Sequence, residues 1–227
     1  MKDIYARAKQ VLVWLGPAAD NSNTAMDFLV ASSFKRLQPK GREYARAWTR
    51  SEVAAVLSVF ERAYWRRIWI IREIVHAQKV YIPCGDRHFH WSRLERFYHK
   101  LKTIAGSLGG WQKHHELGQR LLRSPACTMV SQRAHWRHPN TPRPMLRSLI
   151  ATFKEWECSD VKDKVYGLLA LADAETDVVA DYSNTVEGTY RAVCKSECLF
   201  KFRKVPKEVK NNDAAFCRLL RRILGLA

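Results

Sequence analysis

Apolar residues along the chain form two patterns, short continuous runs and stripes at helical spacing. Val11–Leu15 is a continuous run closed by Gly16-Pro17, which is typical of a buried strand in a parallel sheet. A second run over 79–84 and the alternating residues 88–91 predict two more short strands, separated by the turn pair Gly85-Asp86. The pattern therefore predicts a small sheet of few strands.

Stripes at helical spacing predict that helices occupy most of the remaining chain. The strongest stripe lies over 60–76, where we expect one continuous helix with Trp65, Trp69 and Glu73 along one side. Further helices are predicted over 3–10, 21–34, 48–57, 92–105, 145–156, 162–172 and 187–200. Between Gly106 and Arg143 we expect a surface excursion with a single helix over 115–122.

The chain is strongly basic, with a formal charge of +17 over 227 residues. Such an excess attracts nucleic acid, anionic lipid or acidic partners in general. The Lys and Arg residues are spread along the chain, and no basic run is interleaved with stacking aromatic residues. We therefore expect a diffuse basic surface and no dedicated nucleic-acid site.

The composition changes after Phe200, so residues 201–227 are expected to form a basic tail, solvated at first and ending in a short amphipathic helix. A basic amphipathic helix over 214–226 has two interpretations. It either lies on an anionic membrane surface or packs with its apolar side on its own domain.

The six cysteines follow no disulfide-like spacing, and no secretory signal is visible, which favours free thiols in a soluble, cytoplasmic protein. Cys84, His88 and His90 have a C-x3-H-x-H spacing, but zinc needs three or four ligands and supporting hydrogen bonds, and no further ligand matches. The pair Cys194-x3-Cys198 is a weaker candidate. No metal site is predicted.

Four motifs, in order over residues 4–192, resemble the fungal heterokaryon incompatibility (HET) domain family. They are the helix-strand pair Ile4–Gly16, the tryptophan-rich segment 64–73, the strand Val80–Gly85 with Trp91, and the segment 160–171 followed by 181–183 and 190–191. Two features depart from the family pattern. An earlier strand and helix start of the family have no counterpart, and Arg72 stands where the family has glutamine. The resemblance thus implies a partial, N-terminally truncated HET domain over residues 1–200.

The resemblance also implies a fold and a function. HET domains act inside fungal cells in non-self recognition and trigger programmed cell death when incompatible hyphae form a heterokaryon. Their fold has been likened to the TIR domain, so we expect an α/β fold, an incomplete TIR-like doubly wound sheet of few short strands that is helix-rich overall. Expected partners are other incompatibility or NLR-type proteins, and a homo-oligomer is also expected.

Some TIR domains cleave NAD, so the resemblance makes an NAD glycohydrolase an alternative function, with NAD as substrate and no other cofactor. Glu73 is then the catalytic carboxylate, stabilising an oxocarbenium-like state. Trp69 would stack on the ligand, and Arg72 beside Glu73 favours an ionised carboxylate. Trp14 and Gly16, at the end of the first strand, lie where ligands of open α/β sheets bind.

Each of these residues also has a structural interpretation, which the sequence leaves open. The two tryptophans of the segment can be core packing, with Glu73 ion-paired at a helix surface. Asp160 and Asp163 are expected to be a helix N-cap and an acid in the first turn of that helix. A third functional class, a basic module that binds nucleic acid or anionic membranes, remains a further alternative.

Overall fold

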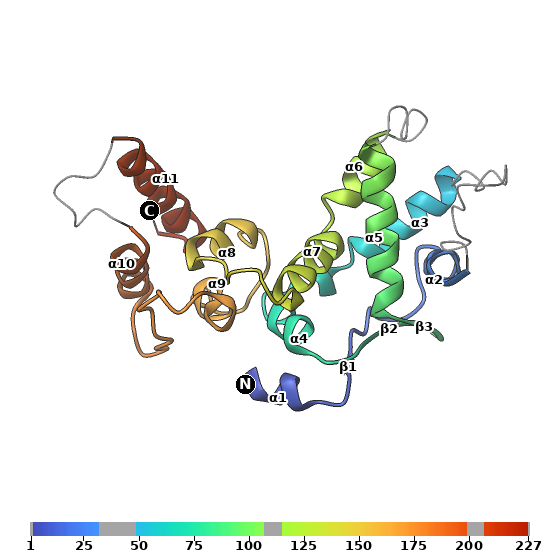
Figure 1. Cartoon of the computed structure of the whole chain (residues 1–227), viewed down its shortest axis with the longest axis horizontal. Coiled ribbons are helices and arrows are strands. Elements are labelled where there is room, and N and C mark those ends of the chain that lie inside the picture. The colour runs from blue at the N-terminus through green and yellow to red at the C-terminus, as the bar shows by residue number, and fades with distance from the viewer. Residues whose placement is uncertain (1, 32–48, 107–114, 199–206, 227) are drawn as a thin grey trace. The chain divides into compact units, whose positions relative to one another are not determined.

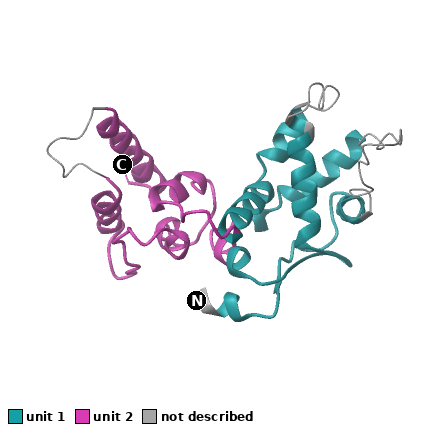
Figure 2. Ribbon diagram, viewed as in Figure 1, with its two compact units in different colours: residues 1–65, 73–137 teal, residues 66–72, 138–227 magenta. Residues whose placement is uncertain are grey.

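The computed structural model describes residues 2–31, 49–106, 115–198 and 207–226. The chain divides into two compact units, one formed by 1–65 and 73–137 and the other by 66–72 and 138–227 (Figure 2). Helices dominate both units, and a small sheet lies in unit 1 (Figure 1). The expected helix-rich α/β class is confirmed. Among the described helices, none is long and apolar enough to cross a membrane.

The sheet has three strands in the order β1-β2-β3. Strand β1 (Val11–Leu12) pairs in parallel with β2 (Val80–Cys84), as predicted for this apolar run, and β2 pairs antiparallel with β3 (Arg87–His90). Backbone bonds extend the parallel pairing beyond β1, from Val13 N to Tyr81 O at 2.8 Å and from Leu15 N to Pro83 O at 3.0 Å. All three predicted strands are therefore present.

Alternating side chains give the sheet one covered and one open face. Val13, Val80, Ile82 and Phe89 are buried, and helices α2 (Ser22–Ala31) and α5 (Trp91–Gly106) pack against β2 and β3. On the other face Leu12 and Trp14 are 57% and 61% exposed. In the described part of the chain, the helices thus cover one side of the sheet. In a doubly wound sheet, by comparison, helices cover both faces.

Residues 2–137 form a series of helices, which belong to unit 1 except over residues 66–72. They are α1 (Lys2–Arg7), α2 (Ser22–Ala31), α3 (Arg50–Phe60), the 3₁₀ turn η1 (Ala63–Arg66), α4 (Ile70–His76), α5 (Trp91–Gly106), α6 (His115–Leu122) and α7 (Pro125–Arg137). Helix α6 has the predicted bounds. Helix α3 starts at a capping box, in which Glu52 N donates to Thr49 Oγ1 at 3.2 Å and Thr49 N donates to Glu52 Oε2 at 2.9 Å.

The prediction of a surface excursion after Gly106 is wrong over 125–137. Helix α7 lies there and buries Cys127, Met129 and Val130, while residues 107–114 are outside the described part. Pro125 suits the first turn of a helix, where its missing N–H has no helical partner in any case. The basic and polar residues of α7 concealed its apolar side in the sequence.

The continuous helix expected over 60–76 is also wrong. Helix α3 ends at Phe60 and α4 begins at Ile70, with η1 between them. The backbone of 66–68 instead forms a parallel bridge with Glu157, and Ile68 N donates to Glu157 O at 2.9 Å. This pairing with a distant segment competes with the helix, and helical periodicity carries no information about it.

Gly85 in the turn between β2 and β3 has a φ of +55°, and an added Cβ would lie 2.8 Å from Ala18 Cβ. We therefore expect Gly85→Ala to lower the free energy of unfolding by about 2 kcal/mol, from backbone strain and overpacking together. Gly225→Ala is the control, because Gly225 has a φ of +69° and an added Cβ meets nothing within 4 Å. It should cost about 1 kcal/mol. Equal losses in urea unfolding would contradict the close contact with Ala18.

Unit 2 contains the remaining elements of the described chain. They are α8 (Leu146–Thr152), α9 (Asp163–Tyr166), the 3₁₀ turn η2 (Leu169–Leu171), α10 (Val186–Glu197) and α11 (Lys207–Ile223). The single helix predicted over 162–172 is thus two short pieces, α9 and η2. The predicted boundary at residue 200 falls within 199–206, outside the described residues.

Helix α11 is longer than the helix expected in the tail, and it packs against α8 and α10. Phe216, Leu220 and Leu224 are buried there. Asp213, expected in a solvated stretch, is fully buried and lies 2.8 Å from Arg147 Nη1 in an ion pair. The apolar side of α11 is thus covered within its own unit, as the second interpretation of the tail predicted.

Candidate functional site

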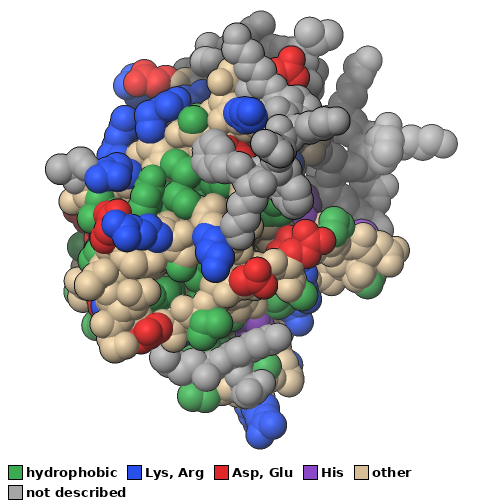
Figure 3. Space-filling model, turned by 90° about the vertical axis from the view of Figure 1, so that its left-hand side faces the viewer, with side chains coloured by type: hydrophobic (Ala, Val, Ile, Leu, Met, Phe, Trp, Pro, Cys, Tyr) green, Lys and Arg blue, Asp and Glu red, His purple; other side chains and the backbone are tan. Residues whose placement is uncertain are grey.

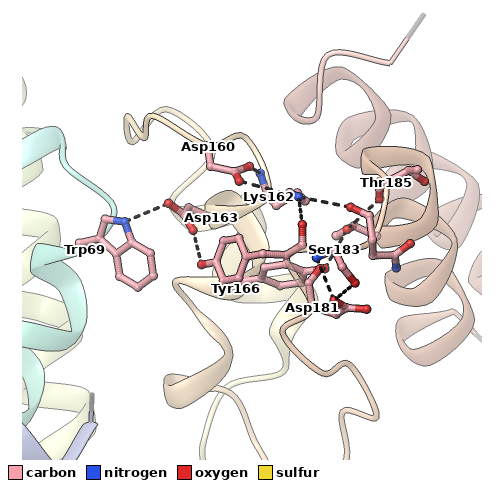
Figure 4. Close-up of polar contacts among 11 residues, drawn as sticks. Trp69, Asp160, Lys162, Asp163, Tyr166, Asp181, Ser183 and Thr185 are labelled. Atoms are coloured by element: carbon pink, nitrogen blue, oxygen red, sulfur yellow. Dashed lines mark hydrogen bonds and ion pairs between the residues drawn. The ribbon is translucent and has the colours of Figure 1, made fainter.

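A buried carboxylate, Asp163, lies at the centre of the polar network of unit 2 (Figure 4). Its side chain is 5% exposed. The Trp69 indole donates from Nε1 to Asp163 Oδ2 at 3.0 Å, and the Tyr182 hydroxyl donates to Oδ1 at 2.6 Å. Each carboxylate oxygen therefore has its own donor. Such charge-assisted bonds are about twice as strong as neutral ones.

The loop before α9 fixes the position of Asp163. The prediction that Asp160 caps this helix is wrong. Its Oδ1 instead accepts from the backbone N of Lys162, two residues further along the chain, at 2.9 Å. Lys162 Nζ donates to the carbonyl oxygens of Tyr182 at 2.7 Å and Asn184 at 3.2 Å. Asp163 does lie in the first turn of its helix, as predicted.

Tyr182 is held in place from a second side. Tyr166 donates its hydroxyl to Asp181 O at 3.0 Å, and the Tyr166 and Tyr182 rings meet edge to face with centroids 5.2 Å apart. Burial, followed by the hydrogen bond to Asp163, raises the pKa of Tyr182. The phenol therefore stays protonated around neutral pH and remains a donor to the carboxylate.

Arg72 completes the cluster, since its guanidinium lies 3.9 Å above the centroid of the Trp69 ring. Arg72 is 8% exposed. A desolvated cation over an indole face is stabilised by the ring quadrupole by about 2 kcal/mol. Trp69 and Arg72, both predicted to bind a ligand, thus contact each other and the Asp163 network. We call Trp69, Arg72, Asp163 and Tyr182 the Asp163 clamp.

Glu73 has different surroundings. Its Oε1 accepts from the Tyr5 hydroxyl at 3.1 Å within unit 1. Trp65 is buried in the core of that unit, where its Nε1 donates to Val59 O at 3.0 Å. The expected alignment of Trp65, Trp69 and Glu73 on one side of a helix is wrong, because the chain leaves the helical path between η1 and α4.

The end of β1, where Trp14 and Gly16 were expected to meet a ligand, is occupied by Arg62. Its Nη1 donates to Leu15 O at 2.6 Å and to Pro17 O at 3.0 Å, and it lies 3.1 Å from Cys84 Sγ. An added Cβ on Gly16, which has a φ of +94°, would meet the same guanidinium at 3.7 Å. Trp14 instead lies on the open face of the sheet, so Trp14 and Gly16 do not line a common site.

The C-x3-H-x-H residues also have other partners, since Cys84 contacts Arg62 and His90 Nδ1 accepts from Ser92 N at 3.2 Å. In the described part of the chain, a different set of side chains could hold a metal ion. This set consists of Cys194, Cys198 and Cys217. The C-x3-C spacing in the sequence connects only Cys194 and Cys198. The third comes from another helix, and no spacing rule connects it to them.

The Asp163 clamp is suited to hold segments together. Each carboxylate oxygen accepts one bond from a side chain of the chain itself and keeps a second lone pair. The donors come from segments 94 and 19 residues away in the sequence. The geometry therefore indicates a conformational anchor that fixes residues 66–72 within unit 2.

Known proteins resemble this chain in sequence. Residues 1–73 match the family model of the heterokaryon incompatibility protein (HET). Heterokaryon incompatibility protein 6, OR allele, of Neurospora crassa is 26% identical to this chain. The alignment covers 82% of this chain and 33% of that relative. The chain thus spans about a third of the length of the relative. No solved structure matches. Residues 1–73 thus match the heterokaryon incompatibility (HET) family, and most of the chain is similar to one of the incompatibility proteins.

Proposed function

We propose that this chain acts in fungal non-self recognition, as a HET-family protein of the cytoplasm that triggers cell death when a heterokaryon forms. The proposal is supported by the family match and by the similarity to an incompatibility protein. One structural observation carries it further. Trp69, inside the matched residues, donates to Asp163 in the later motif that also resembles the family. The clamp therefore joins two separate family-like motifs in one network.

The clamp acts through conformation in this proposal. It holds residues 66–72 against α9, and Tyr182 is 49% exposed at its edge. A fixed surface of this kind suits recognition by other incompatibility or NLR-type proteins or by a second copy of the chain. A chemical reaction at the carboxylate is not required.

We also propose that the sheet is part of a TIR-like wound architecture. Support comes from the parallel pairing of β1 with β2, whose connection runs through α2, α3 and α4. Parallel strands joined through helices are the unit of wound sheets. The exposed Leu12 and Trp14 mark the face on which a second helical layer would lie.

The alternative functions receive less support. NAD cleavage relied on Trp69 next to Glu73, whereas these side chains have separate partners. A nucleic-acid or membrane module rested on the net charge of +17 and on the amphipathic helix over 214–226, whose apolar residues Phe216, Leu220 and Leu224 are buried. On the face drawn in Figure 3, Lys and Arg side chains lie among acidic and apolar ones. Neither alternative is part of the proposal.

Expression of the chain from an inducible promoter in a filamentous fungus tests the proposal. We expect dye-permeable, dead hyphal compartments after induction, and a loss of this effect in Trp69→Phe, because the ring stays but the donor to Asp163 is removed. Asp160→Asn is the matched control, since this carboxylate is partly exposed and lies in the loop before α9, three residues from Asp163. Immunoblots must show equal protein levels. Healthy hyphae despite high levels of the wild-type protein would contradict the proposal, and so would full killing by the Trp69→Phe variant.

A further inference from the structure

Three free thiols of unit 2 lie close together, and none of them belongs to the Asp163 clamp. Cys194 lies on α10, Cys198 caps its C-terminal end, and Cys217 comes from α11. The Sγ atoms of Cys194 and Cys217 are 3.0 Å apart, and those of Cys198 and Cys217 are 3.6 Å apart. All three sulfur atoms lie within 4.8 Å of one another. Three sulfur atoms thus converge on one point between two helices.

This convergence matches the needs of a thiophilic metal ion. Zinc binds cysteine sulfur at about 2.3 Å, so sulfur atoms around one ion lie about 3.8 Å apart. The distances of 3.0 and 3.6 Å approach this value from below, so a shift of Cys217 by less than about 1 Å would admit an ion. Soft thiolate ligands select Cu(I) and Zn²⁺ over hard cations such as Mg²⁺ and Ca²⁺.

A disulfide accounts for the cluster less well. It would use two of the three thiols and leave the third beside it without a role. A metal ion displaces the protons of all three thiols and binds the thiolates directly.

The surroundings of the cluster suit an anionic metal-thiolate centre. Three thiolates leave a net charge of about −1 with Zn²⁺ and about −2 with Cu(I). The Tyr190 hydroxyl is within hydrogen-bond reach of the Cys194 sulfur, and the Arg221 guanidinium lies 5.6 Å from the centroid of the Tyr190 ring. A phenol donor and a nearby cation are the outer contacts that orient and neutralise a thiolate ligand.

We propose that Cys194, Cys198 and Cys217 bind one thiophilic d¹⁰ metal ion, Zn²⁺ or Cu(I), through three thiolates. The ion joins α10 to α11, the two helices on either side of residues 199–206. In the zinc form the fourth position of the tetrahedron is open to water, whereas Cu(I) is satisfied by three sulfur ligands. Metal binding is thus a way to fix the C-terminal helix on unit 2.

The test uses the purified, reduced full chain. Titration with Co²⁺ should produce sulfur-to-cobalt charge-transfer bands that saturate at one ion per chain and disappear when Zn²⁺ is added. A parallel anaerobic titration with Cu(I) against a chromogenic chelator shows which ion binds more tightly. Cys217→Ser should weaken binding by more than about 100-fold, since even outer-contact mutations cost 10–100-fold.

Two further variants keep this test decisive. Cys194→Ala covers the case in which Cys217→Ser unfolds α11, as judged by circular dichroism. Cys158→Ser is the control, because this thiol lies outside the cluster, and it should bind like the wild type. A folded wild type that shows neither cobalt charge-transfer bands nor Cu(I) binding would overturn the proposal. So would a Cys194–Cys217 disulfide in protein purified under reducing conditions, or undiminished binding by Cys217→Ser.

Discussion

Arg133→Met is expected to lower the free energy of unfolding by about 3–5 kcal/mol, the largest loss of any single substitution considered for this chain. Arg133 on α7 is 1% exposed, and its guanidinium reaches the C-terminal end of α4. There Nη1 donates to Ile74 O, and Nη2 donates to Ala77 O at 2.8 Å. Carbonyl groups in the last turn of a helix have no helical donor, so they would be buried and unsatisfied in the variant.

The charge of Arg133 is itself part of this contact. Burial, together with the nearby Arg137, lowers the pKa of Arg133 to about 10, so the side chain is still protonated at neutral pH. A cation at a helix C-terminus is favourable because the carbonyl dipoles point toward it. Met fills a similar volume without a charge or a donor, so the loss reports the hydrogen bonds and the dipole interaction rather than a cavity.

Arg137→Met is the matched control for this prediction. Arg137 is on the same helix and donates to Gln78 O at 3.4 Å, but its side chain is exposed. Its loss should change the free energy of unfolding by less than about 0.5 kcal/mol. Urea unfolding followed by circular dichroism measures both values. If the two variants lose the same stability, Arg133 does not hold the end of α4.

Local patterns in the sequence were sufficient to predict the strands. The apolar run over 11–15, the run over 79–84 and the alternation over 88–91 each correspond to a strand, because burial of one sheet face imposes these patterns directly. Helix α6 was predicted as the single helix of the segment after Gly106. Helix α7 was not, since Arg133 suggests an exposed surface in the sequence, whereas its burial depends on carbonyl groups of another helix.

The candidate site was predictable only in its parts. Trp69, Arg72 and Asp163 were each identified from motifs, but the bond between Trp69 and Asp163 links residues 94 positions apart. The break between α3 and α4, which turns Trp69 away from Glu73, depends on a bridge to Glu157. Such pairings are decided by tertiary structure, so no helical period or capping rule indicates them.

Asp163→Asn is expected to lower the free energy of unfolding by about 2–4 kcal/mol. The carboxylate accepts one bond on each oxygen, from Trp69 Nε1 and from the Tyr182 hydroxyl. Asparagine offers one oxygen and one NH₂ group, so one of the two donors faces another donor. The Tyr182 hydroxyl can rotate and accept from the NH₂ group, but the indole N–H of Trp69 can only donate. The loss of the charge weakens the remaining bond as well.

A double-mutant cycle with Trp69→Phe separates this contact from other effects of the substitutions. If Asp163 acts through the indole, Trp69→Phe should cost less in the Asp163→Asn background than in the wild type, because the neutral amide oxygen accepts a weaker bond from the indole, with a coupling of about 1 kcal/mol. Asp160→Asn is the control, because its partly exposed carboxylate makes only local contacts, a backbone bond from Lys162 N and a 3.8 Å ion pair with Lys162 Nζ, and it should cost less than about 0.5 kcal/mol. Strictly additive losses would mean that Asp163 and Trp69 stabilise the fold independently. The clamp would then have no role in holding residues 66–72 in unit 2.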